Sequence, residues 1–123
     1  MSAKIENGAS SETLTRERTW ITELMNHPDV PQVSLATARV EPGITTELHR
    51  VAVAEWYVLI EGSGRMEVEG EAPFDVSAGD SVAIPAGASQ RITNTGSSDL
   101  VFHCICTPRF TPGGYQFVEA DHA

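Results

Sequence analysis

Short apolar segments alternate with turn-forming residues from residue 31 onward. The apolar segments have the length of strands, and Gly, Pro, Asp and Asn stand between them. We expect strands over residues 32–40, 45–53, 55–60, 65–69, 81–84, 90–93 and 100–107. Many short strands with regular turn signals favour an all-β protein, built as an antiparallel sandwich or barrel.

Two of the predicted strands are apolar on both faces. Residues 65–69 alternate between polar and apolar, as a half-exposed strand does. Residues 56–60 and 100–106 do not alternate, which indicates that both of their faces are covered. We expect the outer face to pack against an amino-terminal helix or a second subunit, and on this basis we predict a homodimer.

The amino-terminal region carries a helical pattern. Trp20, Ile21, Leu24 and Met25 fall on one stripe at helical spacing. This spacing predicts a short helix over residues 15–25, which the following His-Pro-Asp sequence ends.

The pattern divides the chain into four segments. They are a flexible tail over residues 1–12, a short helix and linker over 13–30, a single β-barrel domain over 31–118, and a second tail over 119–123.

Composition and charge exclude several classes of protein. A chain of 123 residues fits one domain, and its 41% hydrophobic residues argue against general disorder. The 8 basic and 17 acidic residues give a formal charge of −9, so neither nucleic acid nor an acidic membrane surface is an expected partner. The start of the sequence has no hydrophobic signal segment, and we expect a cytoplasmic protein.

The two cysteines, Cys104 and Cys106, lie two residues apart in a predicted strand and therefore share a face. The pattern favours two small buried side chains over a soft-metal or redox pair.

Two of the four histidines, His49 and His103, fall in predicted strands. His49 has Glu47 two residues before it and Glu55 six residues after it. Inward-facing imidazole and carboxylate groups in a barrel suit Zn, Fe, Ni or Mn. The alternative is that Glu55 is an exposed turn residue and His49 an ordinary polar strand residue, and spacing alone leaves both open.

Two ordered motifs resemble those of the cupin superfamily. The first family motif reads Gly, five residues, His, one residue, His, three or four residues, Glu, six residues, Gly. The second reads Gly, five residues, Pro, one residue, Gly, two residues, His, three residues, Asn. The matching positions are Gly43, His49, Glu55 and Gly62 in the first motif and Gly79, Pro85, Gly87 and Asn94 in the second.

The resemblance covers about residues 33–110. It implies a double-stranded β-helix, the jelly-roll barrel of small single-domain cupins. It also implies that residues 52–54, which include no Gly, Pro, Asn or Asp, form the bend of a hairpin inside an otherwise continuous strand.

The resemblance further implies a divalent metal, held by the two histidines and the glutamate of the first motif and the histidine of the second. Val51 stands at the second position here and Gln90 at the last. Val51 has no ligating atom, and an amide oxygen such as that of Gln90 is a weaker donor. The candidate ligands are His49, Glu55 and Gln90, with either Glu47 or His103 in place of the missing one. Glu47 lies two residues before His49 and shares its face in a strand, and His103 lies on a later strand.

Two functions follow from the resemblance. The first is a metal-dependent enzyme acting on a small oxygenated substrate as a dioxygenase, isomerase or lyase, with Tyr57 as a catalytic hydrogen-bond donor or acid. The second is a metal-free cupin that binds a small molecule, with His49, Glu55 and Gln90 as its orienting groups. The alternative for Tyr57 is a core aromatic residue.

Overall fold

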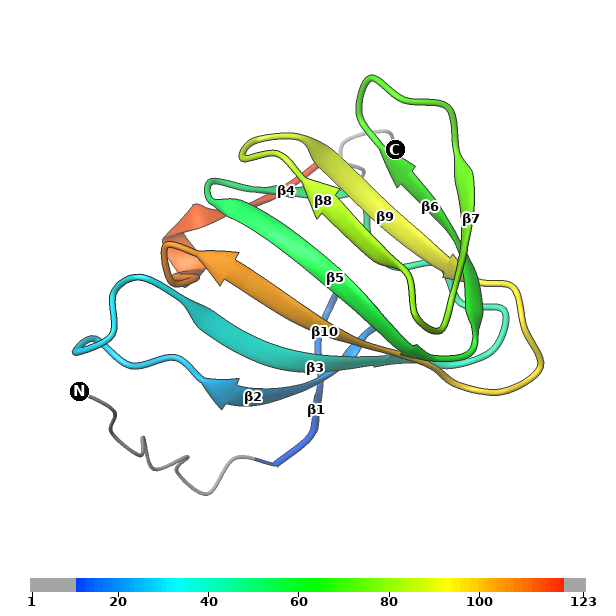
Figure 1. The fold of residues 1–123 in the computed structure, drawn as a ribbon, viewed down its shortest axis with the longest axis horizontal. Helices are drawn as coiled ribbons and strands as arrows, with labels where there is room; N and C mark the ends of the chain where they lie inside the picture. The colour runs from blue at the N-terminus through cyan, green and yellow to red at the C-terminus, as the bar shows by residue number, and fades with distance from the viewer. Residues whose placement is uncertain (1–10, 119–123) are drawn as a thin grey trace.

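The computed structural model of the protein describes residues 11–118, which form two antiparallel sheets (Figure 1). The larger sheet has the order β1 (Thr13–Leu14), β2 (Trp20–Met25), β3 (Ser34–Val40), β10 (Leu100–Thr107), β5 (Ala54–Glu61) and β8 (Ser81–Ile84). The smaller sheet has the order β11 (Tyr115–Phe117), β4 (His49–Val51), β9 (Ser89–Asn94), β6 (Ser63–Val68) and β7 (Phe74–Ser77). A 3₁₀ turn, Pro112–Gly114, precedes β11. The all-β antiparallel class predicted from the sequence is confirmed.

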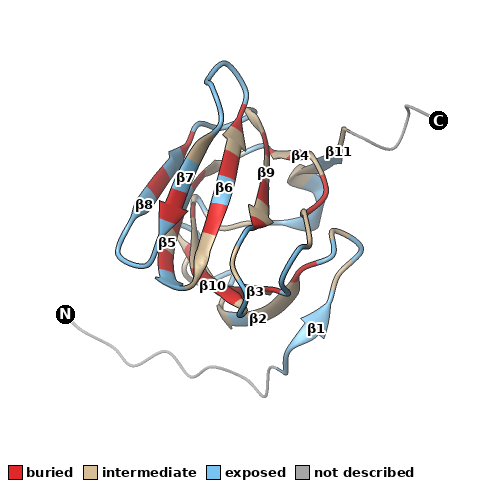
Figure 2. Ribbon diagram, turned by 90° about the vertical axis from the view of Figure 1, so that its right-hand side faces the viewer, coloured by how far each residue is buried: buried red, intermediate tan, exposed pale blue. Residues whose placement is uncertain are grey.

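The core lies between the inner faces of the two sheets. Its most deeply buried apolar side chains are Val40, Leu59, Met66, Ile92, Leu100 and Phe102. Successive residues of a strand point to opposite faces, and Figure 2 shows the resulting alternation of buried and exposed positions along β6. Position 64 on β6 requires glycine, because a Cβ atom there would lie 2.8 Å from the Thr93 carbonyl oxygen of β9.

The amino-terminal helix predicted over residues 15–25 is wrong. Residues 20–25 form strand β2, which pairs with the edge of β3 and places Ile21 opposite Ala38. The ladder shifts register between Glu23 and Met25, which accounts for an apolar pattern without strict alternation. Sheet pairing satisfies the backbone groups of β3 and outweighs the local helical spacing.

Residues 15–19 turn the chain between β1 and β2. The Thr15 amide donates to the Thr19 carbonyl oxygen at 2.9 Å, and Arg18 takes a positive φ of 67°. The Glu47 amide donates to the Glu17 carbonyl oxygen at 3.0 Å, and the Arg18 guanidinium donates to the Thr45 carbonyl oxygen at 2.8 Å. These bonds fasten the turn to the segment that leads into β4.

The hairpin expected around residues 52–54 is instead a corner between the two sheets. β4 pairs with β9 and β11, whereas β5 pairs with β8 and β10. The strand expected over residues 45–53 is reduced to β4 and an isolated bridge at Thr45. The corner places the inner residues of β4 and β5 on facing walls of one interior.

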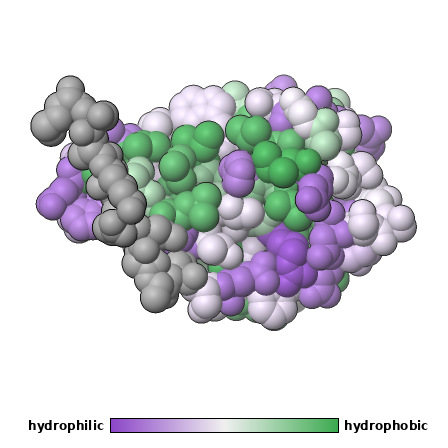
Figure 3. All heavy atoms as spheres, turned by 60° about the horizontal axis from the view of Figure 1, so that its bottom comes forward, coloured by the Kyte–Doolittle hydropathy of each residue, from purple (hydrophilic) through white to green (hydrophobic). Residues whose placement is uncertain are grey.

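The outer face of the larger sheet includes exposed apolar residues. Trp56 is 37% exposed and Ile60 is 41% exposed. Figure 3, which brings the lower side of Figure 1 forward, shows separate hydrophobic areas with polar residues between them. β2 extends the larger sheet at its edge and does not lie across this face, so the homodimer remains a prediction.

The predicted tails, residues 1–12 and 119–123, fall almost wholly outside the described residues. In the part of the chain that the structure describes, no helix is long and apolar enough to cross a membrane.

Candidate functional site

A cavity of about 450 Å³ opens between the sheets next to the packed core. Its apolar lining includes Ile21, Val51, Phe102, Phe110 and Phe117. The turn before β2 and the segment leading into β11 contribute further lining residues, so both terminal parts of the described chain help to form the cavity. A cavity of this size lies in the usual range for a small-molecule site.

His49 lies at the start of β4, where its side chain is 5% exposed and borders the cavity. Its Nδ1 is 2.7 Å from the Glu47 carbonyl oxygen. Because a carbonyl oxygen only accepts, Nδ1 carries the proton of this bond, and in the neutral ring Nε2 is an acceptor. The ring stacks on Tyr115 with centroids 4.8 Å apart and planes 11° apart, which fixes its orientation.

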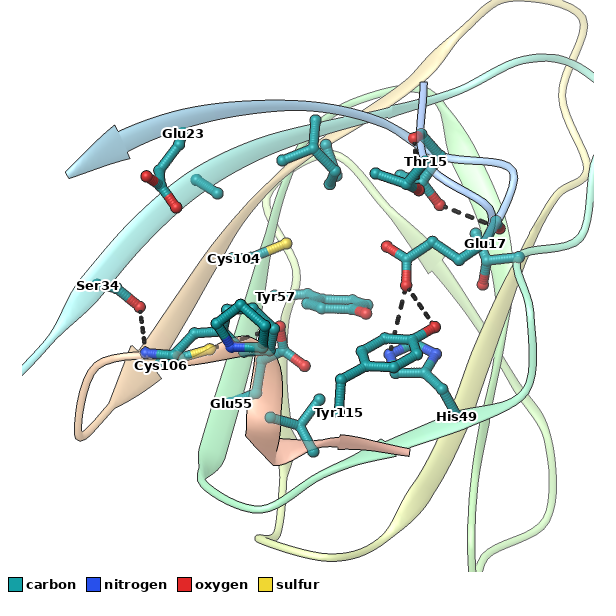
Figure 4. A pocket seen from close by; sticks show the side chains of 18 of the residues that line it. Thr15, Glu17, Glu23, Ser34, His49, Glu55, Tyr57, Cys104, Cys106 and Tyr115 are labelled. Carbon is teal, nitrogen blue, oxygen red and sulfur yellow. Dashed lines mark hydrogen bonds and ion pairs between the residues drawn. The ribbon is translucent and has the colours of Figure 1, made fainter. Parts of the chain in front are cut away.

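Glu17 and Tyr115 complete the environment of His49 (Figure 4). The Tyr115 hydroxyl donates to Glu17 Oε2 at 2.8 Å, and the same oxygen lies 3.9 Å from His49 Nε2. Burial, followed by the charge of Glu17, raises the pKa of Tyr115, which keeps the phenol protonated. Three segments distant in sequence therefore place an imidazole, a carboxylate and a phenol together.

Sequence reasoning missed Glu17 and Tyr115. Glu17 lies in the segment predicted as a helix, and Tyr115 follows the last motif residue. Their position beside His49 depends on how the two terminal segments close over the barrel, and no local pattern encodes that contact.

Glu55 lies on β5 at the cavity wall, where the residue is 8% exposed. Its Oε1 accepts a hydrogen bond from Gln90 Nε2 at 2.8 Å, and its Oε2 accepts one from Cys106 Sγ at 3.7 Å. Burial raises the pKa of Glu55, while the Gln90 hydrogen bond opposes this shift. The exposed-turn alternative for Glu55 is therefore wrong.

Gln90 is fully buried, and its Oε1 has no hydrogen-bond partner among the described residues. It is not among the residues that line the cavity, and it reaches the site only through Glu55.

Tyr57 and the two cysteines lie on inner faces and line the same cavity. Tyr57 is 5% exposed, and its ring lies 4.4 Å from that of Phe102. Burial raises the pKa of Tyr57 well above its usual value, so the hydroxyl stays protonated. Burial also raises the pKa of Cys104, and it raises that of Cys106 to about 12. Both free cysteines are held as neutral thiols, as small buried side chains would be.

The structure separates the remaining candidates from the cavity. Glu47 is buried, but its carboxylate turns toward the Arg16 guanidinium at 3.5 Å and the Tyr115 hydroxyl at 3.3 Å. His103 lies on the opposite face of β10 from Cys104, and its Nδ1 is 3.1 Å from the Thr37 hydroxyl. Neither side chain lines the cavity, so His103 does not supply the ligand that Val51 lacks.

Comparison with known families decides the classification. The family model described as the cupin domain matches residues 36–106, which is more than half of the chain. The chain belongs to the cupin family. An uncharacterised protein of Methanocaldococcus jannaschii is 32% identical to it over 110 residues, covering 86% of each chain.

Solved structures resemble this cupin in fold. The polyketide cyclase RemF from Streptomyces resistomycificus has a TM-score of 0.77 and 18% identity, over 99% of this chain and 89% of that one. Bacillus subtilis oxalate decarboxylase, studied for its Mn(II) centres, has a TM-score of 0.75 and 25% identity, over 88% of this chain. The match spans 30% of the oxalate decarboxylase chain, so that enzyme is much larger than this cupin.

The donor set of this cupin does not fit a resident metal ion. Val51 offers no ligating atom, and the Gln90 amide directs its N–H group at Glu55. Within residues 11–118, no group of three His, Cys, Asp or Glu side chains is placed to hold a metal. His49 and Glu55 alone fall short of the three or four ligands that a stable site requires.

Proposed function

We propose that this cupin binds a small molecule with an apolar body in the barrel cavity, and that it does so without a metal ion. The cavity volume and a lining that combines apolar side chains with polar groups such as His49, Glu17 and Glu55 are typical of ligand sites. His49, Glu17 and Glu55 orient the ligand through hydrogen bonds, and Tyr57 supplies a protonated hydroxyl.

The observation that carries this proposal is the 2.8 Å hydrogen bond from Gln90 Nε2 to Glu55 Oε1. The bond leaves lone pairs on Glu55, but it shows that the Gln90 amide directs its N–H group, and not its oxygen, at the carboxylate. A histidine at position 90 would offer a ring nitrogen to a metal, whereas an amide N–H repels a cation. Gln90, which stands where the family motif has a histidine, therefore forms a hydrogen-bonded pair with Glu55 in place of a pair of metal ligands.

The metal-dependent enzyme implied by the family remains a prediction that metal analysis tests. It requires Zn, Fe, Ni or Mn on a set drawn from the five candidate ligands. The protein should be purified without a chelator or an affinity tag and its metal content measured. We expect less than about a tenth of an equivalent of any transition metal. A near-stoichiometric metal that His49→Ala removes would contradict the metal-free proposal.

Ligand binding is tested with a filled cavity and a matched control. Ala36 lies on β3 and lines the cavity, whereas its neighbour Thr37 points to the outer face of the same strand. Ala36→Phe is expected to abolish saturable binding of a neutral probe such as benzyl alcohol, and Thr37→Phe to leave it unchanged. Equal binding by both variants would place the probe outside the cavity and overturn the proposal.

A further inference from the structure

We infer that the ligand of this cavity carries a cationic amine head on its apolar body. This inference rests on the proposed function, because it specifies the chemistry of the small molecule that the cavity binds. It comes from three features of the cavity: its unused hydrogen-bond acceptors, its committed donors and its unbalanced charge.

The unused acceptors belong to His49 and Glu17, which lie next to each other at the cavity wall. His49 Nε2 lies 3.9 Å from Glu17 Oε2, which is beyond hydrogen-bond length, and its side chain is 5% exposed. Glu17 Oε2 accepts from Tyr115, whereas Glu17 Oε1 has no hydrogen-bond partner within residues 11–118. An ammonium group has three N–H donors and no acceptor, so it matches a pair of acceptors better than an alcohol or an acid does.

Most donors around the cavity are committed to oxygen atoms of the protein. The Thr15 hydroxyl donates to the Thr19 carbonyl oxygen at 2.9 Å, and the Thr19 hydroxyl donates to the Glu17 carbonyl oxygen at 3.4 Å. The Asn26 amide donates to the Phe110 carbonyl oxygen at 2.8 Å. A carboxylate ligand, which only accepts, would therefore find few donors.

The charge of the cavity is also unbalanced. Glu17, Glu23 and Glu55 line it, and no Lys or Arg forms an ion pair with any of them within the described residues. The base beside Glu17 is the His49 ring, whose Nε2 lies 3.9 Å from Glu17 Oε2. Arg16 lies at the rim, where its side chain is 60% exposed, its guanidinium is 3.1 Å from the Phe117 ring centroid, and it points to Glu47. When the His49 ring is neutral, the half-buried Glu17 carboxylate has no cation beside it, and a ligand ammonium would supply that cation.

The walls provide a site for the rest of the ligand. Phe102, Phe110 and Phe117 line the cavity together with aliphatic side chains. The Tyr115 ring lies beside the His49 and Glu17 acceptors and is stacked on the His49 ring, which holds these groups in place. A ligand with an apolar or aromatic body and one ammonium end would place its body against these side chains and its ammonium group beside His49 and Glu17.

The test uses three probes of one shape and different charge: benzylammonium, benzyl alcohol and benzoate. Dissociation constants are measured at pH 7 by NMR titration of chelator-treated full-length protein. We expect benzylammonium to bind about ten-fold more tightly than benzyl alcohol, and benzoate to bind most weakly. Glu17→Gln should remove the preference for benzylammonium, because it weakens benzylammonium binding about ten-fold and weakens benzyl alcohol binding much less. Glu12→Gln, which changes a carboxylate paired with Arg39 outside the cavity, should alter neither.

The outcomes separate this inference from the proposed function. Benzoate binding as tightly as benzylammonium, or a preference for benzylammonium that survives Glu17→Gln, would overturn the amine inference while the binding function stands. Saturable binding by none of the three probes would overturn both. Binding of benzylammonium only after addition of Zn²⁺ or Mn²⁺ would assign the carboxylates of the cavity to a metal, and would overturn both the inference and the metal-free function.

Discussion

The two ends of the barrel use the same strands for opposite purposes. At the closed end, the inner positions of β5, β9 and β10 hold Leu59, Ile92 and Leu100, each at most 1% exposed. At the open end, the inner positions of β5 and β9 hold Glu55 and Gln90. The alternation of inner and outer residues continues along each strand, but the chemistry of the inner residue changes from apolar to polar.

This difference shows how stability and binding are divided along a strand. Close packing of large apolar side chains supplies the free energy of folding at the closed end. The open end holds a buried carboxylate, a cavity and an amide oxygen without a partner among residues 11–118, each of which opposes folding. Substitutions at the two ends should therefore change stability in opposite directions.

The largest expected effect is at the closed end. Leu59→Ala removes a fully buried side chain from the core cluster and leaves a void. We expect the free energy of unfolding to fall by about 3 kcal/mol, measured by urea denaturation. A loss below about 1 kcal/mol would mean that the closed end is not the main source of stability.

The next largest effect is a gain in the free energy of unfolding, caused by a substitution at the open end. Glu55→Gln removes a buried carboxyl group and retains an oxygen that accepts from Gln90. We expect the variant to be more stable than the wild type at pH 8 by on the order of 1 kcal/mol. A loss of stability on this substitution would contradict the division between the two ends.

The pH dependence follows from the same carboxyl group. The pKa of Glu55 is raised in the folded protein above its ordinary value of 4.5, so the native state binds more protons than the unfolded state. Its contribution to stability is therefore present at low pH and is lost as the pH rises from 4.5 through the folded-state pKa. Urea denaturation between pH 4 and 8 should show the advantage of Glu55→Gln growing with pH, and a constant difference would exclude this titration.

A smaller effect is expected for Tyr115→Phe. The variant keeps the ring that stacks on His49 and loses the hydroxyl that donates to Glu17. We expect a change in the free energy of unfolding of about 1 kcal/mol or less. The affinity for benzylammonium should be retained or improved, because Glu17 then has a further free lone pair. Abolished binding would show that the hydroxyl itself contacts the ligand.

The smallest effect on ligand binding is expected for a substitution on the outer face of the larger sheet. The predicted homodimer uses this face, where Trp56 is 37% exposed. Trp56→Glu should reduce the mass measured by light scattering from that of a dimer to that of a monomer, with ligand affinity unchanged. A wild-type protein that is monomeric at micromolar concentration would contradict the homodimer prediction.

The sequence predicts the closed end well and the open end in part. Regular alternation and turn residues locate most strands, because burial of one face imposes a period of two. The face that His103 occupies follows from the register of β10 against β3, which no single strand reveals. Glu17 enters the site because β2 adds to the sheet edge and its preceding turn docks on the Glu47 amide. Such contacts depend on the tertiary arrangement and not on local pattern.

Metal-free binding of a small molecule at the open end can be measured by titrating chelator-treated protein with benzyl alcohol. The account predicts saturable chemical-shift changes at Val51, Tyr57 and Phe102, unaltered by added Zn²⁺ or Mn²⁺. Changes that occur only after either metal is added, and that His49→Ala abolishes, would contradict it.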